Sequence, residues 1–457
     1  MGKALQRALG TGAFLFLAAA PLTAAGQTLT EALATAYQNN PTLQAQRAQL
    51  RAVDEAVPQA TAGWRPTITL NAEAGRNRNE GNLFAQSSGA QNRSPSSVNL
   101  QVSQPLFRGG RTIYETRRAE NRVQAERARL RVVEAETLLD AATAFMDVLR
   151  DQAVVELSVN NEQVLRRQLE AAVSRFEVGE ITRTDVAQAE ARLAGARAAR
   201  IRAEGDLASS RAAFKTVIGV APQQLIAPPG PGNLPEVRET ALQRAANYYP
   251  GVIAAAFDEK AARETVNAVE GELLPTVSLN GEVSRAREQF SSADDTERAE
   301  ITAQLTVPLY QAGAVHSRLR EARQVAGQRQ VEVDKARREA IEQSALAWSD
   351  LEAARASIVS LESQIGASTI ALEGVNQEAL VGSRTVLDVL DAEQELLDAK
   401  VALVQAKRDA FVAGFRLKSA MGVLTAEALS LPVQPYDMNE HYNAVRDKWI
   451  GLGDDPE

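Results

Sequence analysis

The sequence contains no cysteine and only two histidines, His316 and His441, among 457 residues. Without cysteine there is no disulfide bond and no lipid-modified N-terminal cysteine, so stability must come from burial and assembly. Neither histidine stands in a cluster with metal-ligand spacing. There is also no nucleophile elbow, phosphate-binding loop or zinc motif. The sequence therefore predicts a protein that is not an enzyme and that holds no metal or cofactor.

Charge-free apolar runs of membrane-spanning length are lacking as well. The apolar run at residues 8–20 follows Lys3 and Arg7, and small residues after it suit cleavage near Ala25. A membrane-spanning helix needs about 20 apolar residues, so this layout instead predicts a signal peptide at residues 1–25. Removal of its two basic residues changes the net charge from −8 to −10. Such an acidic exported protein is not expected to bind nucleic acid.

Proline is absent from two long stretches, residues 106–221 and 309–431. A proline inside a helix costs roughly 3 kcal/mol, and both stretches are rich in the strong helix formers Ala, Arg, Glu, Gln and Leu. Gly179 and Gly382 interrupt them, and each glycine is followed by Thr and Asp residues that suit the start of a new helix. The predicted helical hairpins span residues 111–219 and 314–422.

The two hairpins belong to an internal repeat. The pattern Val-Gly, five residues, Asp-Val occurs at residues 178–186 and again at 381–389, a shift of 203 residues. Pro41 recurs in the same way as Pro250, a shift of 209 residues. Such a duplication predicts one fold built from two similar halves. The predicted organisation is a first repeat at 28–219, a proline-rich linker at 220–239, a second repeat at 240–422 and a C-terminal belt or tail at 423–457.

Helix lengths require a further element in each half. At 1.5 Å per residue, a helix over residues 111–178 is on the order of 100 Å long, whereas its return helix over 182–219 is about 57 Å long. The helical segment at 30–63, which opens with a capping-box pattern at 28–31, is expected to pack against the remaining length. Residues 240–274 have the same role in the second half.

Between the helices the hydrophobic period changes from 3.6 to 2. Polar and apolar side chains alternate in four segments, which predicts strands at about 67–76, 98–107, 276–285 and 299–309. Any one of them alone is typical of a half-buried strand in a soluble protein. Strands of about ten residues with Ile, Leu and Val on one face and Thr, Asn and Gln on the other also suit an outer-membrane barrel.

The barrel interpretation assigns the apolar faces to lipid. The predicted lipid-facing residues are Ile68, Leu70, Leu100, Val102, Val277, Leu279, Ile301 and Leu305. Four strands cannot close a water-filled barrel, and open sheet edges are not tolerated in lipid. If these strands cross a membrane, several chains must therefore contribute strands to one barrel.

Residues 381–392 closely resemble the second-hairpin signature of the TolC-type outer-membrane efflux and type I secretion channels, and residues 178–187 form a weaker copy. The resemblance extends over essentially the whole chain after the signal peptide. It implies a mixed α and β membrane protein of a Gram-negative cell: a homotrimer with a twelve-stranded barrel that continues as a helical tunnel in the periplasm. It also implies a periplasmic adaptor and an inner-membrane transporter as partners. The tail after residue 431 is most similar to the type I secretion branch, and the cargo, drugs or a secreted protein, stays open.

The resemblance further implies roles for residues at the hairpin ends. They are Asp388 and Asp391 at the narrowest point of the pore, Asp185 and Arg384 in contacts that hold it closed, and Gly179 and Gly382 at tips that dock the adaptor. At a spacing of three, the two aspartates of the second hairpin share one helix face, which without the resemblance indicates only a solvated acidic surface. The sequence departs from the family at Ala379, a position often occupied by Tyr.

Two alternatives remain open at this level. A periplasmic adaptor also contains a helical hairpin, but it would have one hairpin and a compact β domain. A coiled-coil scaffold without a pore would have no need for amphipathic strands.

Overall fold

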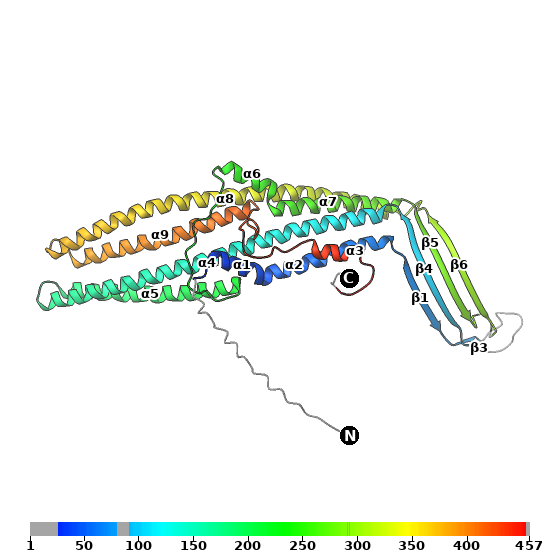
Figure 1. Ribbon diagram of the computed structural model, residues 1–457, viewed down its shortest axis with the longest axis horizontal. Coiled ribbons are helices and arrows are strands. Elements are labelled where there is room, and N and C mark those ends of the chain that lie inside the picture. The colour runs from blue at the N-terminus through cyan, green and yellow to red at the C-terminus, as the bar shows by residue number, and fades with distance from the viewer. Residues whose placement is uncertain (1–25, 80–90, 290, 292, 454–457) are drawn as a thin grey trace, which may run out of the picture.

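The computed structural model describes residues 26–79, 91–289, 291 and 293–453 (Figure 1). The predicted signal peptide at residues 1–25 lies outside the described residues. The chain forms a long rod in which a bundle of helices leads into a sheet at one end (Figure 1). Among the described residues, no helix combines the length and the hydropathy that are needed to cross a bilayer.

The first half starts with a helical segment that is broken at Pro41. Its elements are α1 (Leu29–Asn39), α2 (Pro41–Asp54), α3 (Ala56–Thr61) and the short 3-10 helix η1 (Ala62–Trp64). The Thr28 side chain accepts a hydrogen bond from the Glu31 N–H, and the Glu31 carboxylate accepts one from the Thr28 N–H. This is the capping box that the sequence predicts. Asn40 then caps α2 by accepting from the N–H groups of Thr42 and Leu43.

The remaining elements contain the predicted helices and strands in the predicted order, together with three short elements that the sequence does not predict, β2, β3 and α10. The first half continues with β1 (Thr67–Ala74), β2 (Asn77–Asn79), β3 (Gln91–Arg93), β4 (Ser96–Arg108), α4 (Arg111–Glu177) and α5 (Arg183–Ile218). The second half contains α6 (Arg238–Tyr248), α7 (Pro250–Glu270), η2 (Gly271–Leu273), β5 (Thr276–Arg287), β6 (Asp295–Thr306), α8 (Ala314–Leu380), α9 (Val386–Ala420) and α10 (Glu440–Val445). The predicted fold class, two long helical hairpins with four amphipathic strands, is confirmed.

One strand differs from its expected range. β6 covers residues 295–306, whereas the alternation predicts residues 299–309. Pro308 explains the earlier end, because a proline has no N–H to donate to the strand ladder. Leu309 and Tyr310 consequently lie beyond the strand and are exposed.

The sheet joins the two halves of the repeat. Its strand order is β1-β4-β5-β6, and each neighbouring pair is antiparallel. The central pair, β4 with β5, brings together one strand from each half; Leu100, for example, lies opposite Val283. The helical layer continues in a similar order, with α2 beside α4, α4 beside α7, and α7 beside α8 (Figure 1).

The largest apolar core lies near the middle of the rod, where α1, α2, α4 and α5 meet the end of α9. Phe145 of α4 and Phe214 of α5 are fully buried there, with ring centroids 6.3 Å apart. Phe411 stacks on Phe415 of α9 at 4.9 Å in the same cluster. This core lies at the end of α5. Beyond that point α1 and α2, and no longer α5, pack against α4.

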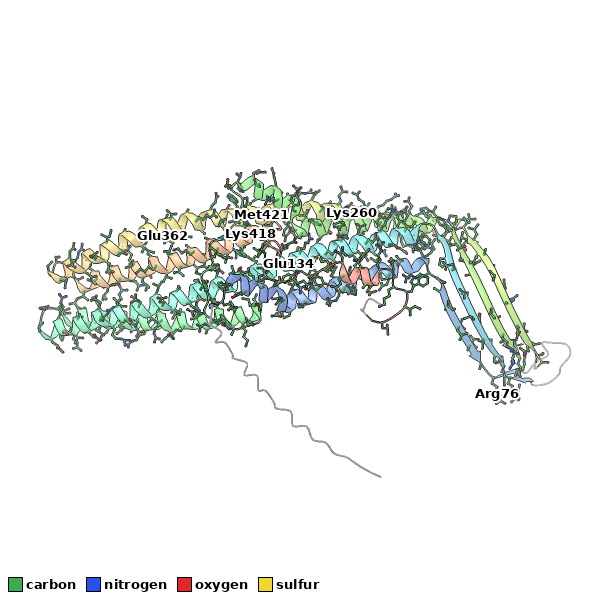
Figure 2. All side chains as sticks on the ribbon, in the orientation of Figure 1. Arg76, Glu134, Lys260, Glu362, Lys418 and Met421 are labelled. Carbon is green, nitrogen blue, oxygen red and sulfur yellow. The ribbon has the colours of Figure 1, made fainter. Side chains whose placement is uncertain are left out.

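The segment after α9 packs back along the rod and belongs to the fold. The Ala426 N–H donates to Glu134 Oε1 of α4 at 2.8 Å, and the Tyr436 N–H donates to the Tyr37 hydroxyl at 3.0 Å. Figure 2 shows Glu134 in the middle of the rod, away from both ends. Farther along, His441 Nδ1 of α10 lies 3.2 Å from Asp54 Oδ2 of α2. The tail, whose structure the sequence leaves open, is therefore attached to the first half.

We expect Glu134→Ala to destabilise the folded chain by about 1–3 kcal/mol, because the buried Ala426 N–H loses its acceptor. Glu134→Gln keeps an acceptor and is the matched control. Burial raises the pKa of Glu134 above its ordinary value of 4.5. The stabilisation from this carboxyl is therefore present at low pH and is lost as the pH rises through the raised pKa. Denaturant titrations should show this pH dependence in the wild type and not in Glu134→Gln; equal stability of Glu134→Ala and the wild type would contradict the assignment.

Candidate functional site

The eight residues predicted to face lipid all lie on one face of the sheet. Ile68 is opposite Val102, Leu70 is opposite Leu100, and Val277 is opposite Leu305. Gly281 is paired with both Val102 and Ile301, which places β4, β5 and β6 in one register. Directly opposed residues of antiparallel strands share a face. Six of these side chains are exposed, with Ile68 at 67% and Ile301 at 81%, while Val102 and Val277 are half-buried, so this chain leaves most of its apolar surface uncovered. Their contact with lipid stays a prediction.

The opposite face of the sheet is polar and hydrogen-bonded across the strands. Ser103 Oγ of β4 donates to Asn280 Oδ1 of β5 at 2.7 Å, and Asn280 Nδ2 donates to Gln304 Oε1 of β6 at 3.3 Å. Thr302 Oγ1 donates to Glu300 on the same face. The sheet thus separates an apolar surface from a surface that suits water.

The apolar face has a limited height. On β5 it extends over residues 277–283, a rise of about 20 Å at 3.3 Å per residue, which is close to the band of about 25 Å on outer-membrane barrels. Arg285 ends the band at the outer side, where it pairs with Asp295 at 2.7 Å and Glu297 at 3.2 Å. At the helical side, Trp64, Phe107 and Tyr310 are exposed. Trp and Tyr, whose rings are amphipathic, are enriched at membrane–water interfaces.

Both outer edges of the sheet are unpaired. Within the described part of the chain, β1 pairs only with β4, and β6 pairs only with β5. An unpaired strand edge leaves a row of backbone N–H and C=O groups without partners. In lipid, these groups must be bonded by strands of another chain.

The hairpin tips at the other end of the rod have nearly identical backbones. The N–H of Gly179 donates to the Phe176 carbonyl, and the N–H of Glu180 donates to the Arg175 carbonyl, the two bonds of a Schellman motif. Gly382 and Ser383 repeat the arrangement. The φ angles of the two glycines are 79° and 77°, in the left-handed region that other residues rarely adopt. No atom lies within 4 Å of a Cβ placed at either glycine, so the chain itself needs them only for the turn.

Asp185 and Asp388 occupy equivalent positions in the return helices. Each carboxylate accepts hydrogen bonds from the backbone N–H and the hydroxyl of the threonine that caps its helix, Thr182 or Thr385, all at 2.8 Å. The N–H and hydroxyl of Thr385 hold the pKa of Asp388 below its usual range. Asp388 is therefore held ionised at the start of α9, where the helix dipole also favours a negative charge.

The predicted gate pair is not formed within one chain. Arg384 Nε donates to Glu378 at 2.8 Å, across its own turn. Among the described residues, no hydrogen bond or ion pair connects Asp185 to Arg384. A contact between these residues of neighbouring chains stays a prediction, since only one chain is present.

A different ion pair connects the two hairpins. Arg192 Nη2 of α5 donates to Asp391 Oδ1 of α9, and the side chains are 40% and 56% exposed. Leu390 lies beside this pair and packs into a cluster with Leu165 and Leu193 of the first hairpin. The sequence assigns Asp391 to the pore but misses Arg192 as its partner. No local pattern in the sequence indicates this contact, because the two residues lie in different hairpins, 199 positions apart.

The described residues contain no group of three or more side chains that could hold a metal ion. The polar clusters that stand out are the strand face and the hairpin ends. Neither arranges a nucleophile beside a base, and both instead form surfaces.

Comparisons with known proteins agree with this architecture. A family model described as outer membrane efflux protein matches residues 32–220 and 241–423. The outer membrane efflux protein BepC of Brucella suis is 37% identical over 431 residues, which cover 94% of this chain and 92% of BepC. The outer membrane protein TolC of Vibrio cholerae is 27% identical over 427 residues, or 90% of this chain and 95% of TolC. A solved structure of CusC, described as a transmembrane channel, superposes with a TM-score of 0.77 at 17% identity and covers 87% of this chain and 92% of its own.

We expect Leu279→Arg, on the apolar face of β5, to reduce the stability of the membrane-inserted protein by about 2–4 kcal/mol. Thr302→Arg on β6 is the control, because it puts the same charge on the polar face and should be tolerated. Urea titration of the protein in detergent micelles or lipid bilayers gives the free energy of unfolding of each variant relative to the wild type. Equal losses in the two variants would show that the apolar face does not contact lipid.

The Arg192–Asp391 pair should hold the hairpin tips together. Exposed ion pairs contribute about 0–1 kcal/mol, so Arg192→Glu should shift the tips towards larger separations, and exchanging the two charges should restore the wild-type distances. Because the chain has no cysteine, cysteines introduced at Glu180 and Ser383 carry the only spin labels, and assembly with an excess of unlabelled chain isolates the distance within one chain. Arg337→Glu, which breaks an ion pair inside α8, is the control. An unchanged distance distribution in Arg192→Glu would refute this role.

Proposed function

The chain belongs to the outer membrane efflux protein family, and on that premise we propose that it is the outer-membrane exit channel of an efflux or type I secretion system. Members of this family are channels and not enzymes, and they extend from the outer membrane of Gram-negative cells into the periplasm. They form trimers and work with a periplasmic adaptor and an inner-membrane transporter. The periplasmic adaptor and the poreless scaffold are therefore set aside as identities for this chain.

The observation that carries the proposal is a sheet with an exposed apolar face, a polar opposite face and two unpaired edges. Three copies of four strands close into a barrel when β6 of one chain pairs with β1 of the next. Closure bonds the backbone groups at every edge and turns the polar faces towards a shared, water-filled interior. The helical layers of the three chains then continue the wall below the membrane.

The periplasmic end is the proposed gate. Three copies of Asp388 and Asp391 would form two stacked rings of carboxylates at the constriction, and rings of one charge select ions of the opposite charge. Arg192 balances the Asp391 ring as long as the ion pair between them is closed, so the Asp388 ring supplies the negative charge in the closed state. Asp185 and Arg384 would meet between neighbouring chains in the closed state. The tips at Gly179 and Gly382, flanked by Val178 at 72% and Val381 at 80% exposure, would receive the adaptor, since a glycine turn lets another chain approach closely.

Reconstitution into planar bilayers tests the proposal. The purified trimer should conduct, prefer cations and lose conductance as acid neutralises the rings. Replacement of both Asp388 and Asp391 by Ala should weaken the cation preference and the acid response, whereas Asp334→Ala on α8, an exposed acid far from the tips, should change neither.

Two outcomes contradict different parts of the proposal. A correctly assembled trimer that does not conduct, even when both aspartates are replaced, would refute the channel. A double variant with unchanged selectivity and acid response would leave the channel in place and put the constriction elsewhere.

A further inference from the structure

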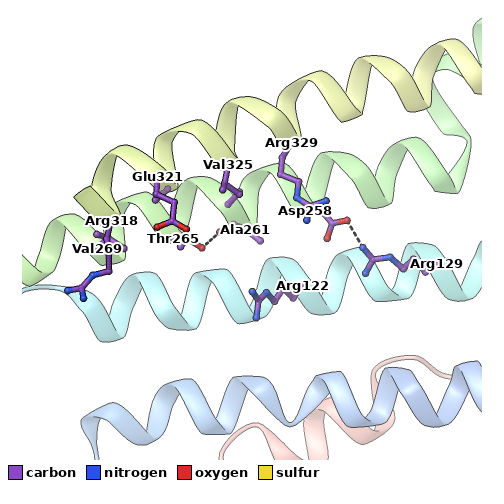
Figure 3. A pocket seen from close by; sticks show the side chains of 12 residues that line it. Arg122, Arg129, Asp258, Ala261, Thr265, Val269, Arg318, Glu321, Val325 and Arg329 are labelled. Atoms are coloured by element: carbon purple, nitrogen blue, oxygen red, sulfur yellow. Dashed lines mark hydrogen bonds and ion pairs between the residues drawn. The ribbon is translucent and has the colours of Figure 1, made fainter. Parts of the chain in front are cut away.

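A recess of about 420 Å³ lies between α4, α7 and α8, in the part of the helical layer next to the sheet (Figure 3). Its charged lining residues are Arg122 and Arg129 of α4, Asp258 of α7, and Arg318, Glu321 and Arg329 of α8. We call it the arginine recess. Arg122 follows the start of α4 by eleven residues, which is about 17 Å from the end of the strands at 1.5 Å per residue.

The shape of the arginine recess follows from residue size. The middle helix, α7, contributes the small residues Ala261, Ala262 and Thr265, while longer side chains extend from the helices on either side (Figure 3). The recess is therefore a hollow over α7 with arginines around it. Val269 and Val325 add an apolar part to the lining. Its volume lies in the range of about 300–1,000 Å³ that is usual for small-molecule sites.

The arginine recess opens away from the tail. Arg127 of α4 contacts α10 on the outer side, where its guanidinium lies 5.1 Å from the Tyr442 ring. At about 100° per residue, Arg122 and Arg129 are each about 140–160° round the helix from Arg127. In the trimeric channel of the proposed function, on which this inference rests, we take the tail to form the expected belt around the outside, which turns the opposite face towards the interior.

The positive charge of the arginine recess is balanced by neighbouring carboxylates, and the lining itself also includes the carboxylate of Glu321. Arg129 pairs with Glu126 at 2.9 Å and also with Asp258. Arg318 pairs with Glu272, and Arg329 pairs with Glu332 at 2.7 Å. These contacts hold the arginine side chains in place around the hollow.

Arg122 is different, because among the described residues it has neither a hydrogen bond nor an ion pair, although Asp258 lies near enough to attract it. The Arg122 residue as a whole is exposed to solvent, and the partial desolvation of its guanidinium, together with the nearby charge of Arg118, lowers the pKa of that group. An arginine stays charged under physiological conditions. The recess thus contains a guanidinium whose charge the chain leaves without a bonded counter-charge.

We propose that the arginine recess binds small organic anions that pass through the channel, with Arg122 as the residue that contacts the anionic group. A guanidinium presents paired N–H donors that match a carboxylate or a phosphate. The valine side chains suit an apolar body attached to that group. The recess thereby gives the interior near the membrane a preference for anionic cargo, opposite in sign to the carboxylates at the periplasmic tips.

Titration calorimetry on the purified trimer tests this site with phenyl phosphate and benzoate as probes and benzylammonium as the cationic counterpart. Both anions should bind, and benzylammonium should not. Arg122→Gln should weaken anion binding at least fivefold, and Arg122→Lys should recover part of the loss. Arg118→Gln removes the same charge one turn away, outside the lining, and should change the affinity less than twofold.

Three outcomes of the titrations would contradict anion binding at Arg122. Unchanged binding in Arg122→Gln, equal weakening in Arg122→Gln and Arg118→Gln, or equal binding of benzylammonium would overturn the proposal, since each indicates at most a general field or an apolar patch. Mass measurement of each variant confirms that it is a trimer before titration. Because binding is measured without current, a conducting trimer that fails to bind anions refutes the recess alone, and a trimer that binds anions without conducting refutes the channel alone.

Discussion

A lipid bilayer offers no water to backbone N–H and C=O groups, so every strand in it must be paired on both sides. This chain supplies four paired strands and leaves the outer edges of β1 and β6 unpaired. It cannot satisfy these edges by itself, because a closed barrel needs more strands than one chain contains. Each half of the duplication supplies two strands to the sheet. When several chains assemble, their sheets join edge to edge and close into a barrel. The exposed apolar face, the polar face and the need for identical partners are consequences of this one requirement.

The wall must pass from strands to helices without a break, and the chain accomplishes this with glycine. Gly109 and Gly110 connect β4 to α4 with φ angles of 64° and 76°, and Gly313 precedes α8 with φ 75°. A Cβ at Gly109 would lie 2.1 Å from the carbonyl oxygen of Gly271, in the other half of the repeat. The two halves therefore meet backbone to backbone at the junction. This close approach lets the helices α4 and α7 continue directly from the neighbouring strands β4 and β5.

Periodicity and proline placement were sufficient to predict the helices of both repeats and the four strands of the larger sheet, because such elements are encoded locally, but they did not predict the short elements β2, β3 and α10. The capping boxes at Thr28 and the threonine–aspartate starts of both return helices are equally local. The strand order is not, since it depends on which strand of one half meets the other. The Arg192–Asp391 pair was missed for a similar reason: the residues are 199 positions apart, and only the packing of α5 near α9 brings them together. The predicted contact between Asp185 and Arg384 follows neither from the local sequence nor from the fold of one chain, because it needs a second chain.

Opposite demands act on the two ends of the rod. The membrane end must be permanent, and there unsatisfied backbone groups would each cost several kcal/mol, which makes opening the barrel prohibitive. In the proposed gate the periplasmic end must open, and its hairpins are held together by the exposed Arg192–Asp391 pair, worth about 0–1 kcal/mol, and by the buried side chain of Leu390, which packs against Leu165 and Leu193. Three copies of the Arg192–Asp391 pair then contribute at most a few kcal/mol, less than the binding energy of a typical docked protein at micromolar affinity, about 8 kcal/mol. The glycine turns do not have to move for this, since their Schellman bonds lie within each tip. The hairpins can therefore move as rigid units, and the energy of docking a partner must offset both the ion pairs and the burial of Leu390 in order to separate them.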